Sequence, residues 1–136
     1  MDSGWDAEQV VRRVARCADR SDIAAMVENF SEDAVLDVGG RITEGRDAIF
    51  EFFGGSSTAV PSETERTKHV VTNTTLDADG DTLVATSYFQ VVRSWGLANW
   101  GRYLDRLAES AGTWKIVHRT VVVDGNIPRP ERPPAE

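Results

Sequence analysis

Helical periodicity dominates the first third of the chain. Between Asp6 and Arg20, apolar residues recur every three or four positions, which predicts an amphipathic helix with one buried face. Asp22 can cap a second helix, in which four apolar residues between Ile23 and Phe30 fall on one side. A third helix is predicted from Arg46 to Phe53. The pattern therefore indicates three helices before the chain changes its period.

The rest of the chain has the composition of strands and turns. Ser31–Asp33 predicts a turn, and Ala34–Val38 predicts a short strand that the following glycine pair ends. Four longer strands are predicted in the second half, over residues 66–76, 82–94, 98–110 and 113–124. Helices followed by an antiparallel meander indicate an α+β fold, whose twisted sheet can curl into a half-open cone with a pocket.

Two segments carry no regular pattern. Residues 54–65 are rich in Gly, Ser and Pro, and they predict either a lid over a site or a plain solvated connection. Four prolines beyond Asn126 exclude regular structure there. We therefore expect one domain over residues 1–126 and a Pro-rich tail over 127–136, which is either disordered or packed on a partner.

Composition narrows the function classes. A net charge of −7 and a pI near 4.8 argue against nucleic acid and anionic membranes as partners. No apolar run approaches the roughly 20 residues of a membrane span, and no signal peptide is recognisable. Cys17 is the only cysteine, which excludes an internal disulfide. From the cysteine usage and the missing signal peptide we expect a cytoplasmic protein. No metal-ligand spacing or phosphate-binding loop is present, so we expect neither a metal nor another cofactor.

One predicted strand carries candidate chemistry. Side chains alternate between the faces of a strand, so His69, Val71, Asn73 and Thr75 are expected on one face. This face combines an imidazole with an amide and a hydroxyl, whereas a face used only for packing would repeat Val or Ile. We interpret it as the wall of a polar-lined pocket.

Several segments, in their order along residues 5–125, resemble the SnoaL-like branch of the NTF2-like superfamily. The segments that carry the resemblance are A-R-C-A-D-R-S-D, F-S-E-D-A-V-L-D, E-G-R-D-A-I, K-H-V-V-T-N, G-R-Y-L-D-R-L and G-T-W-K-I-V-H-R. The resemblance implies an NTF2-like cone, with three N-terminal helices packed on a curved, mostly antiparallel sheet. It also implies a deep pocket for a small hydrophobic substrate and a homodimer formed through the sheet.

The dehydratases and dehydrochlorinases of this superfamily pair an Asp of the first helix with a His of the sheet. The resemblance implies that Asp19 and His69 form this pair, with His69 in the H-x-x-T-N pattern that ends at Asn73. An ordinary imidazole titrates near ~6.5 and can take and return a proton at neutral pH. A carboxylate on its other nitrogen fixes the tautomer. The alternative is an edge histidine beside an unrelated, solvated Asp.

Further residues are candidates for substrate binding. Asp37 is either a second pocket carboxylate or an outward-facing Asp, and Arg102 lines the pocket or lies at the surface. The resemblance implies a pocket cation at Arg119, and Asn73 is expected to help hold an oxyanion. Many relatives carry a helix-1 Tyr at the position of Val14, so we expect Tyr88 or Tyr103 to supply the missing phenol.

The sequence predicts a cofactor-independent lyase, isomerase or cyclase. His69 would act as general acid or base on a polyketide-like or aromatic intermediate, with Asp19 orienting it. The alternative is a non-catalytic module of the same fold, which binds a small molecule or assembles as a dimer. A His69–Asp19 hydrogen bond beside an enclosed apolar cavity would favour the enzyme.

Overall fold

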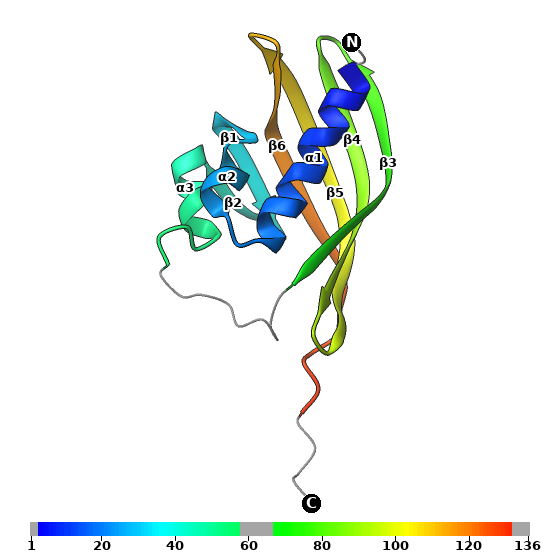
Figure 1. The fold of residues 1–136 in the computed structure, drawn as a ribbon. Coiled ribbons are helices and arrows are strands. Elements are labelled where there is room, and N and C mark those ends of the chain that lie inside the picture. The colour runs from blue at the N-terminus through cyan, green and yellow to red at the C-terminus, as the bar shows by residue number, and fades with distance from the viewer. Residues whose placement is uncertain (1–2, 58–66, 132–136) are drawn as a thin grey trace, which may run out of the picture.

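The computed structural model describes residues 3–57 and 67–131, in which helices cover one side of a curved sheet (Figure 1). The helices are α1 (Ser3–Asp19), α2 (Ile23–Val27) and α3 (Arg46–Phe52). The strands are β1 (Phe30–Val38), β2 (Arg41–Glu44), β3 (Lys68–Asp79), β4 (Thr82–Arg93), β5 (Gly96–Ser110) and β6 (Thr113–Asn126).

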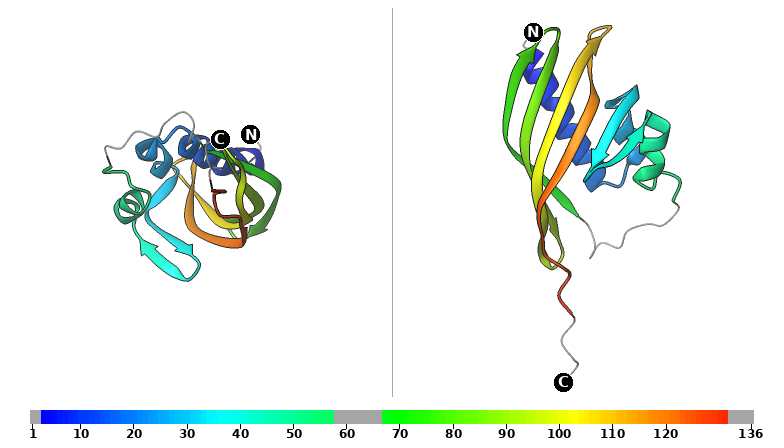
Figure 2. Two further views of the ribbon diagram at one scale, coloured as in Figure 1. Left: turned by 90° about the horizontal axis from the view of Figure 1, so that it is seen from below. Right: turned by 180° about the vertical axis from the view of Figure 1, so that it is seen from behind.

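The sheet has the order β2-β1-β6-β5-β4-β3. Neighbouring strands run antiparallel except β1 and β6, which run parallel. Seen from below, β3–β6 curve around one side of α1 (Figure 2). The predicted α+β cone with a mostly antiparallel sheet is confirmed.

The apolar stripe of α1 explains why the helix lies inside the curve of the sheet. Its buried side chains include Ala7, Val10, Val11, Val14 and Cys17, and the helix packs against β3, β4 and β6. Burying this stripe removes apolar surface from water, at roughly 25 cal/mol per Å². The helix begins at Ser3 instead of the predicted Asp6, so Asp6 lies in its first turn.

The predicted second helix is too long. α2 ends at Val27, and the amide of Asn29 donates to the carbonyls of Ala25 and Met26, which closes the helix end. Phe30 is fully buried and pairs with Ile116 as the first residue of β1. The predicted turn over Ser31–Asp33 lies within β1 as an irregular stretch, because the pairing with β6 shifts between Phe30 and Val35.

A hairpin that the sequence analysis did not predict follows β1. Gly39 and Gly40 both have positive φ (59° and 90°) and join the paired residues Val38 and Arg41. Two positive φ angles in a two-residue loop are the requirement of a type I′ turn, which glycine meets without strain. The glycine pair therefore turns the chain back into β2 instead of only ending a strand.

A bulge interrupts β3 and changes which side chains face inward. The register shifts between Thr72 and Thr75, and Asn73 has a φ of 55°. His69 and Val71 face the helices, but Thr74 and Leu76 take that face beyond the bulge, while Asn73 and Thr75 are exposed. The predicted common face of His69, Asn73 and Thr75 is wrong, because alternation holds only where each residue has one partner.

Beyond β6, residues 127–131 have no regular structure and extend away from the sheet (Figure 1). The backbone N–H of Ile127 donates to the carbonyl of Ala98, which ties the start of this segment to β5. The predicted loop lies largely outside the described residues, apart from a turn at Gly54–Ser56. Of the helices in residues 3–57 and 67–131, none is long and apolar enough to cross a membrane.

Candidate active site

A cavity of about 200 Å³ lies between α1, the α2–α3 region and the inner face of the sheet. We call it the central cavity. Most of its wall is apolar, and its polar lining consists of His69, Asn99, Tyr103 and Arg119. The apolar lining is Val14, Ala15, Ala18, Met26, Val38, Phe52, Phe53, Phe89, Val91, Val121 and Val123. Few polar groups in an apolar hollow are typical of a small-molecule site.

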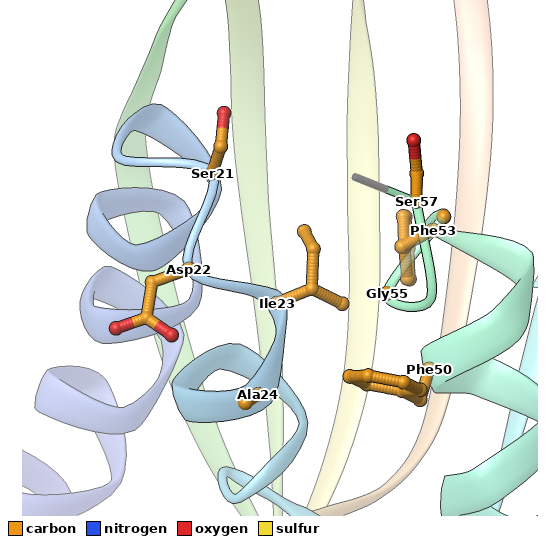
Figure 3. A pocket seen from close by; sticks show the side chains of 9 residues that line it. Ser21, Asp22, Ile23, Ala24, Phe50, Phe53, Gly55 and Ser57 are labelled. Carbon is orange, nitrogen blue, oxygen red and sulfur yellow. The ribbon is translucent and has the colours of Figure 1, made fainter. Parts of the chain in front are cut away.

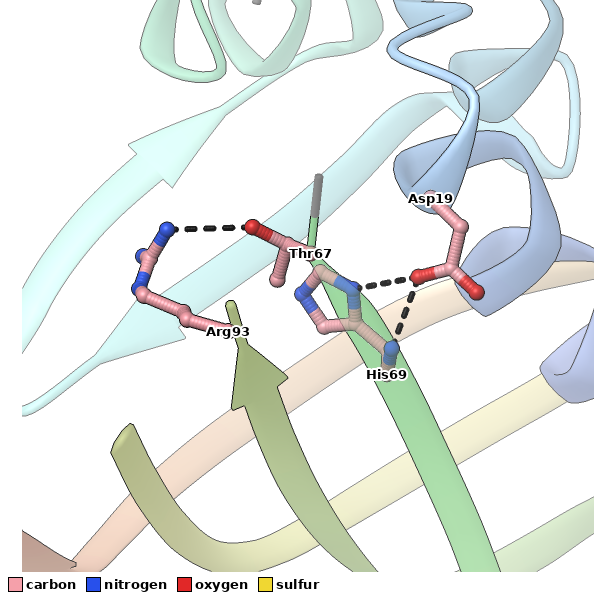
Figure 4. Close-up of polar contacts among 4 residues, drawn as sticks. All are labelled: Asp19, Thr67, His69 and Arg93. Carbon is pink, nitrogen blue, oxygen red and sulfur yellow. Dashed lines mark hydrogen bonds and ion pairs between the residues drawn. The ribbon is translucent and has the colours of Figure 1, made fainter. Parts of the chain in front are cut away.

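Asp19 and His69 meet at the edge of the central cavity (Figure 4). Oδ1 of Asp19 accepts hydrogen bonds from the backbone N–H of His69 at 2.7 Å and from its ring Nδ1 at 2.9 Å. An ionised carboxylate can only accept, so in the neutral imidazole Nδ1 carries the hydrogen and Nε2 has the lone pair. The two side chains are 21% and 24% exposed, which leaves the imidazole accessible to a ligand.

Asp19 lies at the C-terminal end of α1, where a carboxylate does not stabilise the helix. It is the last residue of α1, where the helix macrodipole presents partial negative charge and disfavours a carboxylate. The two hydrogen bonds from His69 offset that cost. Nearby, Nη1 of Arg93 donates to Oγ1 of Thr67 at 3.0 Å, which joins the start of β3 to the end of β4 (Figure 4). The backbone that carries His69 is thus fixed on both sides.

A buried ion pair lies at the wall of the central cavity. Nε and Nη2 of Arg119 donate to the two carboxylate oxygens of Asp105 at 2.7 and 2.9 Å, and the side chains are 5% and 0% exposed. Burial alone would lower the pKa of Arg119, but the charge and hydrogen bonds of Asp105 raise it above its ordinary range. The guanidinium therefore stays charged inside the protein.

A bulge in β6 brings these two residues together. Near the hairpin turn, Ser110 pairs with Thr113, and this register would set Arg119 opposite Leu104. Val117 is an extra residue between the pairs Leu107–Ile116 and Arg106–His118, so Arg119 pairs with Asp105 instead. The shift therefore matches Arg119 with an inward-facing residue of β5 instead of an outward-facing one.

Tyr103 packs directly against this ion pair. The Arg119 guanidinium carbon lies 4.1 Å from the centre of the Tyr103 ring, and Phe89 stacks on that ring at 4.5 Å. Burial raises the pKa of the Tyr103 phenol; the Arg119 cation opposes this, and the carboxylates of Asp105 and Asp19 reinforce it. The phenol therefore remains a hydrogen-bond donor at neutral pH.

The structure does not bring every predicted residue to the central cavity. Asn73 is exposed at the β3 bulge, and Tyr88 and Arg102 pair with each other on the outer face of the sheet, away from the helices. Arg102 there donates to Asp124 at 3.2 and 3.3 Å. The pocket position predicted for Asn73 is wrong, because the bulge turns it outward. Of the alternatives left open, the structure shows Arg102 at the surface, and Tyr103 instead of Tyr88 in the cavity lining.

Asp37 is also placed away from the lining of the central cavity. Its carboxylate accepts a hydrogen bond from the backbone N–H of Gly40 at 2.9 Å and so stabilises the β1–β2 hairpin turn. The sequence did not predict this hairpin, and the role of Asp37 in its turn could not be seen without it. Of the two alternatives for Asp37, the structure therefore excludes the pocket carboxylate.

Sequence reasoning assigned neither Asp105 nor Asn99 to this site, although it noted the charge of Asp105 on the face opposite Arg102. Alternation along β5 does place Asp105 on the face of Tyr103 and Leu107, and a charged residue on an apolar face is a signal for a buried ion pair. Asn99 gives no such signal, because the sequence around it is mixed. It lies beside Val91 through the β4–β5 pairing and so reaches the same lining.

A second hollow, of about 460 Å³, lies between α2 and the end of α3 (Figure 3). It is lined by Ser21, Asp22, Ile23, Ala24, Phe50, Phe53, Gly54, Gly55 and Ser57. Asp22 is the titratable side chain among these, and its carboxylate already accepts from the backbone N–H of Ala25 as the cap of α2. Although this groove is larger, the central cavity has the groups that acid–base chemistry needs.

The described part of the chain holds no group of three or more His, Cys, Asp or Glu residues that could bind a metal ion. An imidazole with a free lone pair, a phenol and a guanidinium together provide one base and two hydrogen-bond donors.

A family model described as the SnoaL-like domain matches residues 3–120. No curated protein matches the chain. Among solved structures, a putative scytalone dehydratase from Novosphingobium aromaticivorans is 19% identical with a TM-score of 0.76, and the match covers 96% of this chain and 93% of that chain. ActVI-ORFA from Streptomyces coelicolor is 18% identical with a TM-score of 0.75, covering 88% and 95%.

A third similar structure is a protein of unknown function with a cystatin-like fold from Nostoc punctiforme. It is 19% identical with a TM-score of 0.78, and the match covers 92% of this chain and 93% of that chain. Identities this low establish a shared fold, and the chemistry has to be argued from the site.

Proposed function

From the premise that this chain belongs to the SnoaL-like domain family, we propose that it is a cofactor-independent enzyme that moves a proton on a small, oxygenated ring compound. The reaction class is that of a lyase, isomerase or cyclase. The observation that carries the proposal is the pair of hydrogen bonds from His69 to Asp19 at the edge of an apolar cavity.

His69 is proposed as the general base. Its Nδ1–H is held by Asp19, so the lone pair of Nε2 takes a proton from a carbon next to a substrate carbonyl. The carboxylate of Asp19 stabilises the imidazolium that forms. Return of the proton to another carbon gives an isomerisation, and its delivery to a leaving hydroxyl gives a dehydration.

The negative charge that develops on the substrate oxygen needs donors. Arg119 and Tyr103 both line the central cavity and are proposed to supply them, in place of the exposed Asn73. Donors fixed in an apolar, water-poor site stabilise such a charge more than donors in water do. The buried Asp105 holds Arg119 in place through two hydrogen bonds.

Deuterium incorporation from heavy water tests the proposal. Cyclohex-3-en-1-one is a neutral one-ring ketone with acidic hydrogens, and NMR follows their exchange. Wild-type protein is expected to accelerate the exchange, and His69→Gln to lower the acceleration by about 10²-fold or more. The matched control is His118→Gln, which changes the chain's other histidine, a residue outside the cavity lining.

Equal exchange by wild type and His69→Gln would contradict the role of His69. Binding of ring ketones without any accelerated exchange would favour the second reading, a non-catalytic binding module of the same fold. The dyad geometry favours the enzyme, since a module that only binds has no need for an imidazole with a fixed tautomer.

We also propose that a second copy of the chain covers the outer face of the sheet. Tyr88 and Leu104 are 53% and 39% exposed there and lie on adjacent strands. Large apolar side chains in neighbouring positions on an open sheet are typical of a surface that is covered in the assembled protein. The central cavity lies on the other side of this sheet, so the two roles do not compete.

A further inference from the structure

The Arg119 guanidinium has one nitrogen left over from its ion pair. Nε and Nη2 are bound to Asp105, and Nη1 has no hydrogen-bond partner in the described part of the chain. Within residues 3–57 and 67–131, every side-chain nitrogen or oxygen that is cut off from solvent has a partner. Nη1 therefore reaches open space, and for a side chain only 5% exposed that space is the central cavity it lines.

The hydroxyl of Tyr103 likewise has no hydrogen-bond partner in the described part of the chain. Tyr103 is buried, lines the central cavity and makes no hydrogen bond to another described residue. By the same reasoning, its O–H also reaches the cavity. The cavity thus presents two unused donors close together, because Arg119 stacks on the Tyr103 ring at 4.1 Å.

The charge around these donors is unusual for a site with an arginine. The carboxylate of Asp105 neutralises the charge of Arg119 through two hydrogen bonds of 2.7 and 2.9 Å. Asp19 adds a second carboxylate at the cavity edge. Among the lining residues and their hydrogen-bond partners, the two carboxylates and one guanidinium leave a net negative charge while His69 is neutral. Charges in a poorly solvated site act strongly, so a ligand that arrives as an anion is repelled.

Cavity size limits the ligand as well. In another protein, an apolar cavity of about 150 Å³ holds one benzene molecule. The central cavity, at about 200 Å³, therefore accommodates one substituted ring. Its apolar lining includes Val14, Phe89 and Val121, which suit the faces of such a ring.

We propose that the central cavity selects neutral one-ring compounds that carry a hydrogen-bond-accepting oxygen, held by Nη1 of Arg119 and the hydroxyl of Tyr103, and rejects the corresponding anions. This rests on the proposed function and specifies its substrate class. A neutral carbonyl becomes negative only during the reaction, when His69 has gained the balancing proton. Asp105 then acts as a positioning residue that also sets charge selectivity.

Three probes of one skeleton test the proposal by NMR or calorimetric titration: acetophenone, benzoate and α-methylstyrene. Acetophenone has a neutral acceptor oxygen, benzoate is ionised at neutral pH, and α-methylstyrene replaces the oxygen by carbon. Acetophenone is expected to bind about tenfold or more tightly than benzoate, because the carboxylates repel the anion. It is also expected to bind several-fold more tightly than α-methylstyrene, because only acetophenone can accept a hydrogen bond, and one hydrogen bond contributes roughly 1 kcal/mol net.

Two variants assign the selectivity. Asp105→Asn removes a negative charge and keeps the shape, so benzoate affinity is expected to rise about tenfold relative to acetophenone. Tyr103→Phe is expected to lower the affinity for acetophenone several-fold and to leave that for α-methylstyrene unchanged. A role of Asp105 confined to folding would weaken all three probes together.

The wild-type titrations decide the matter even if Asp105→Asn does not fold. Benzoate binding as tightly as acetophenone overturns the proposal, and so does the absence of binding by acetophenone up to its solubility limit. These outcomes are separate from those of the exchange assay. Selective binding with no effect of His69→Gln on exchange refutes the enzyme but keeps the ligand class.

Discussion

Oδ1 of Asp19 accepts two hydrogen bonds from one residue, from the backbone N–H of His69 at 2.7 Å and from its Nδ1 at 2.9 Å. The last residue of α1 thereby positions both the backbone and the ring of a residue in β3, fifty positions later in the chain. One oxygen atom fixes the tautomer and the location of the proposed base. Substitutions at Asp19 should therefore separate the effect of its negative charge on His69 from the effect of its two hydrogen bonds.

Asp19→Asn tests the charge. An Asn oxygen can still accept both hydrogen bonds, so the fold is expected to persist while the stabilisation of the imidazolium is lost. We expect the exchange of cyclohex-3-en-1-one to fall by about 10²-fold or more, as for loss of acid–base catalysis. Nitrogen NMR of His69 checks that Nδ1 still carries the hydrogen. Unchanged exchange with an unchanged tautomer would show that the carboxylate charge is not used.

Periodicity and motif order predicted three helices, the long strands and the α+β class, but not the β1–β2 hairpin. The stripe of α1 is buried as its spacing required, and the SnoaL-like match confirms the family that the ordered segments indicated. What periodicity could not supply was the position of irregularities. Asn73 illustrates this, because a single residue with positive φ reversed the face of every later side chain in β3.

Asn73 is accordingly expected to have a backbone role. At a φ of 55°, Asn73→Gly should leave both stability and ketone exchange unchanged, because glycine adopts this conformation freely. Asn73→Val should cost about 1–2 kcal/mol, since a β-branched residue is strained there. Chemical denaturation measures both. The control Thr72→Val, on regular exposed strand beside it, should stay within about 0.5 kcal/mol. A loss of exchange in Asn73→Gly would restore its predicted site role.

The Arg119–Asp105 contact shows a second limit of sequence reasoning. Both residues are visible in the sequence, but their contact depends on an extra residue, Val117, in one of two paired strands. Composition does not mark Val117, which resembles the other valines of β6. The resemblance to a family with a pocket cation pointed to Arg119, whereas nothing in the sequence gave the register that sets Asp105 beside it.

Breaking this buried pair should be costly. Asp105→Ala leaves the Arg119 charge buried without its partner, and the free energy of unfolding is expected to fall by about 3–5 kcal/mol. The matched control is Asp124→Ala, which breaks the half-exposed pair with Arg102 and should cost less than about 1 kcal/mol. The double variant Asp105→Leu with Arg119→Met should be more stable than Asp105→Ala. Equal losses for the two single variants would refute this account.

Assembly through the outer face is tested at Leu104, which lies on β5 near the middle of the strand order. Leu104→Lys places a charge within the proposed interface, so sedimentation should change from dimer to monomer while ketone exchange persists. Ile42→Lys serves as the control, because Ile42 is exposed on β2 at the sheet edge. A wild-type protein that is monomeric at all concentrations would contradict the assembly, and so would a Leu104→Lys dimer.

The buried phenol of Tyr103 should cause a loss of folding stability at alkaline pH. Burial raises the pKa of its phenol above the ordinary 10.0, so the folded state retains this proton when the unfolded state has lost it. Because the unfolded state then binds fewer protons, stability falls as pH rises from 10.0 towards the folded-state pKa, and below 10.0 the effect is absent. Tyr103→Phe has no such proton, so its denaturation midpoint should decline less than that of wild type above pH 10.0.

Tyr88→Phe is the control for this experiment, since it removes the chain's other tyrosine and keeps Tyr103. Its stability should decline with pH as steeply as wild type does. Phenolate absorbance of the same variant reports Tyr103 alone, and it should appear only above pH 10.0 while the protein is folded. A Tyr103→Phe protein whose alkaline decline matches wild type would show that the phenol proton is not linked to folding. The Tyr103 hydroxyl would then be solvated instead of enclosed, which would also remove it as a donor in the central cavity.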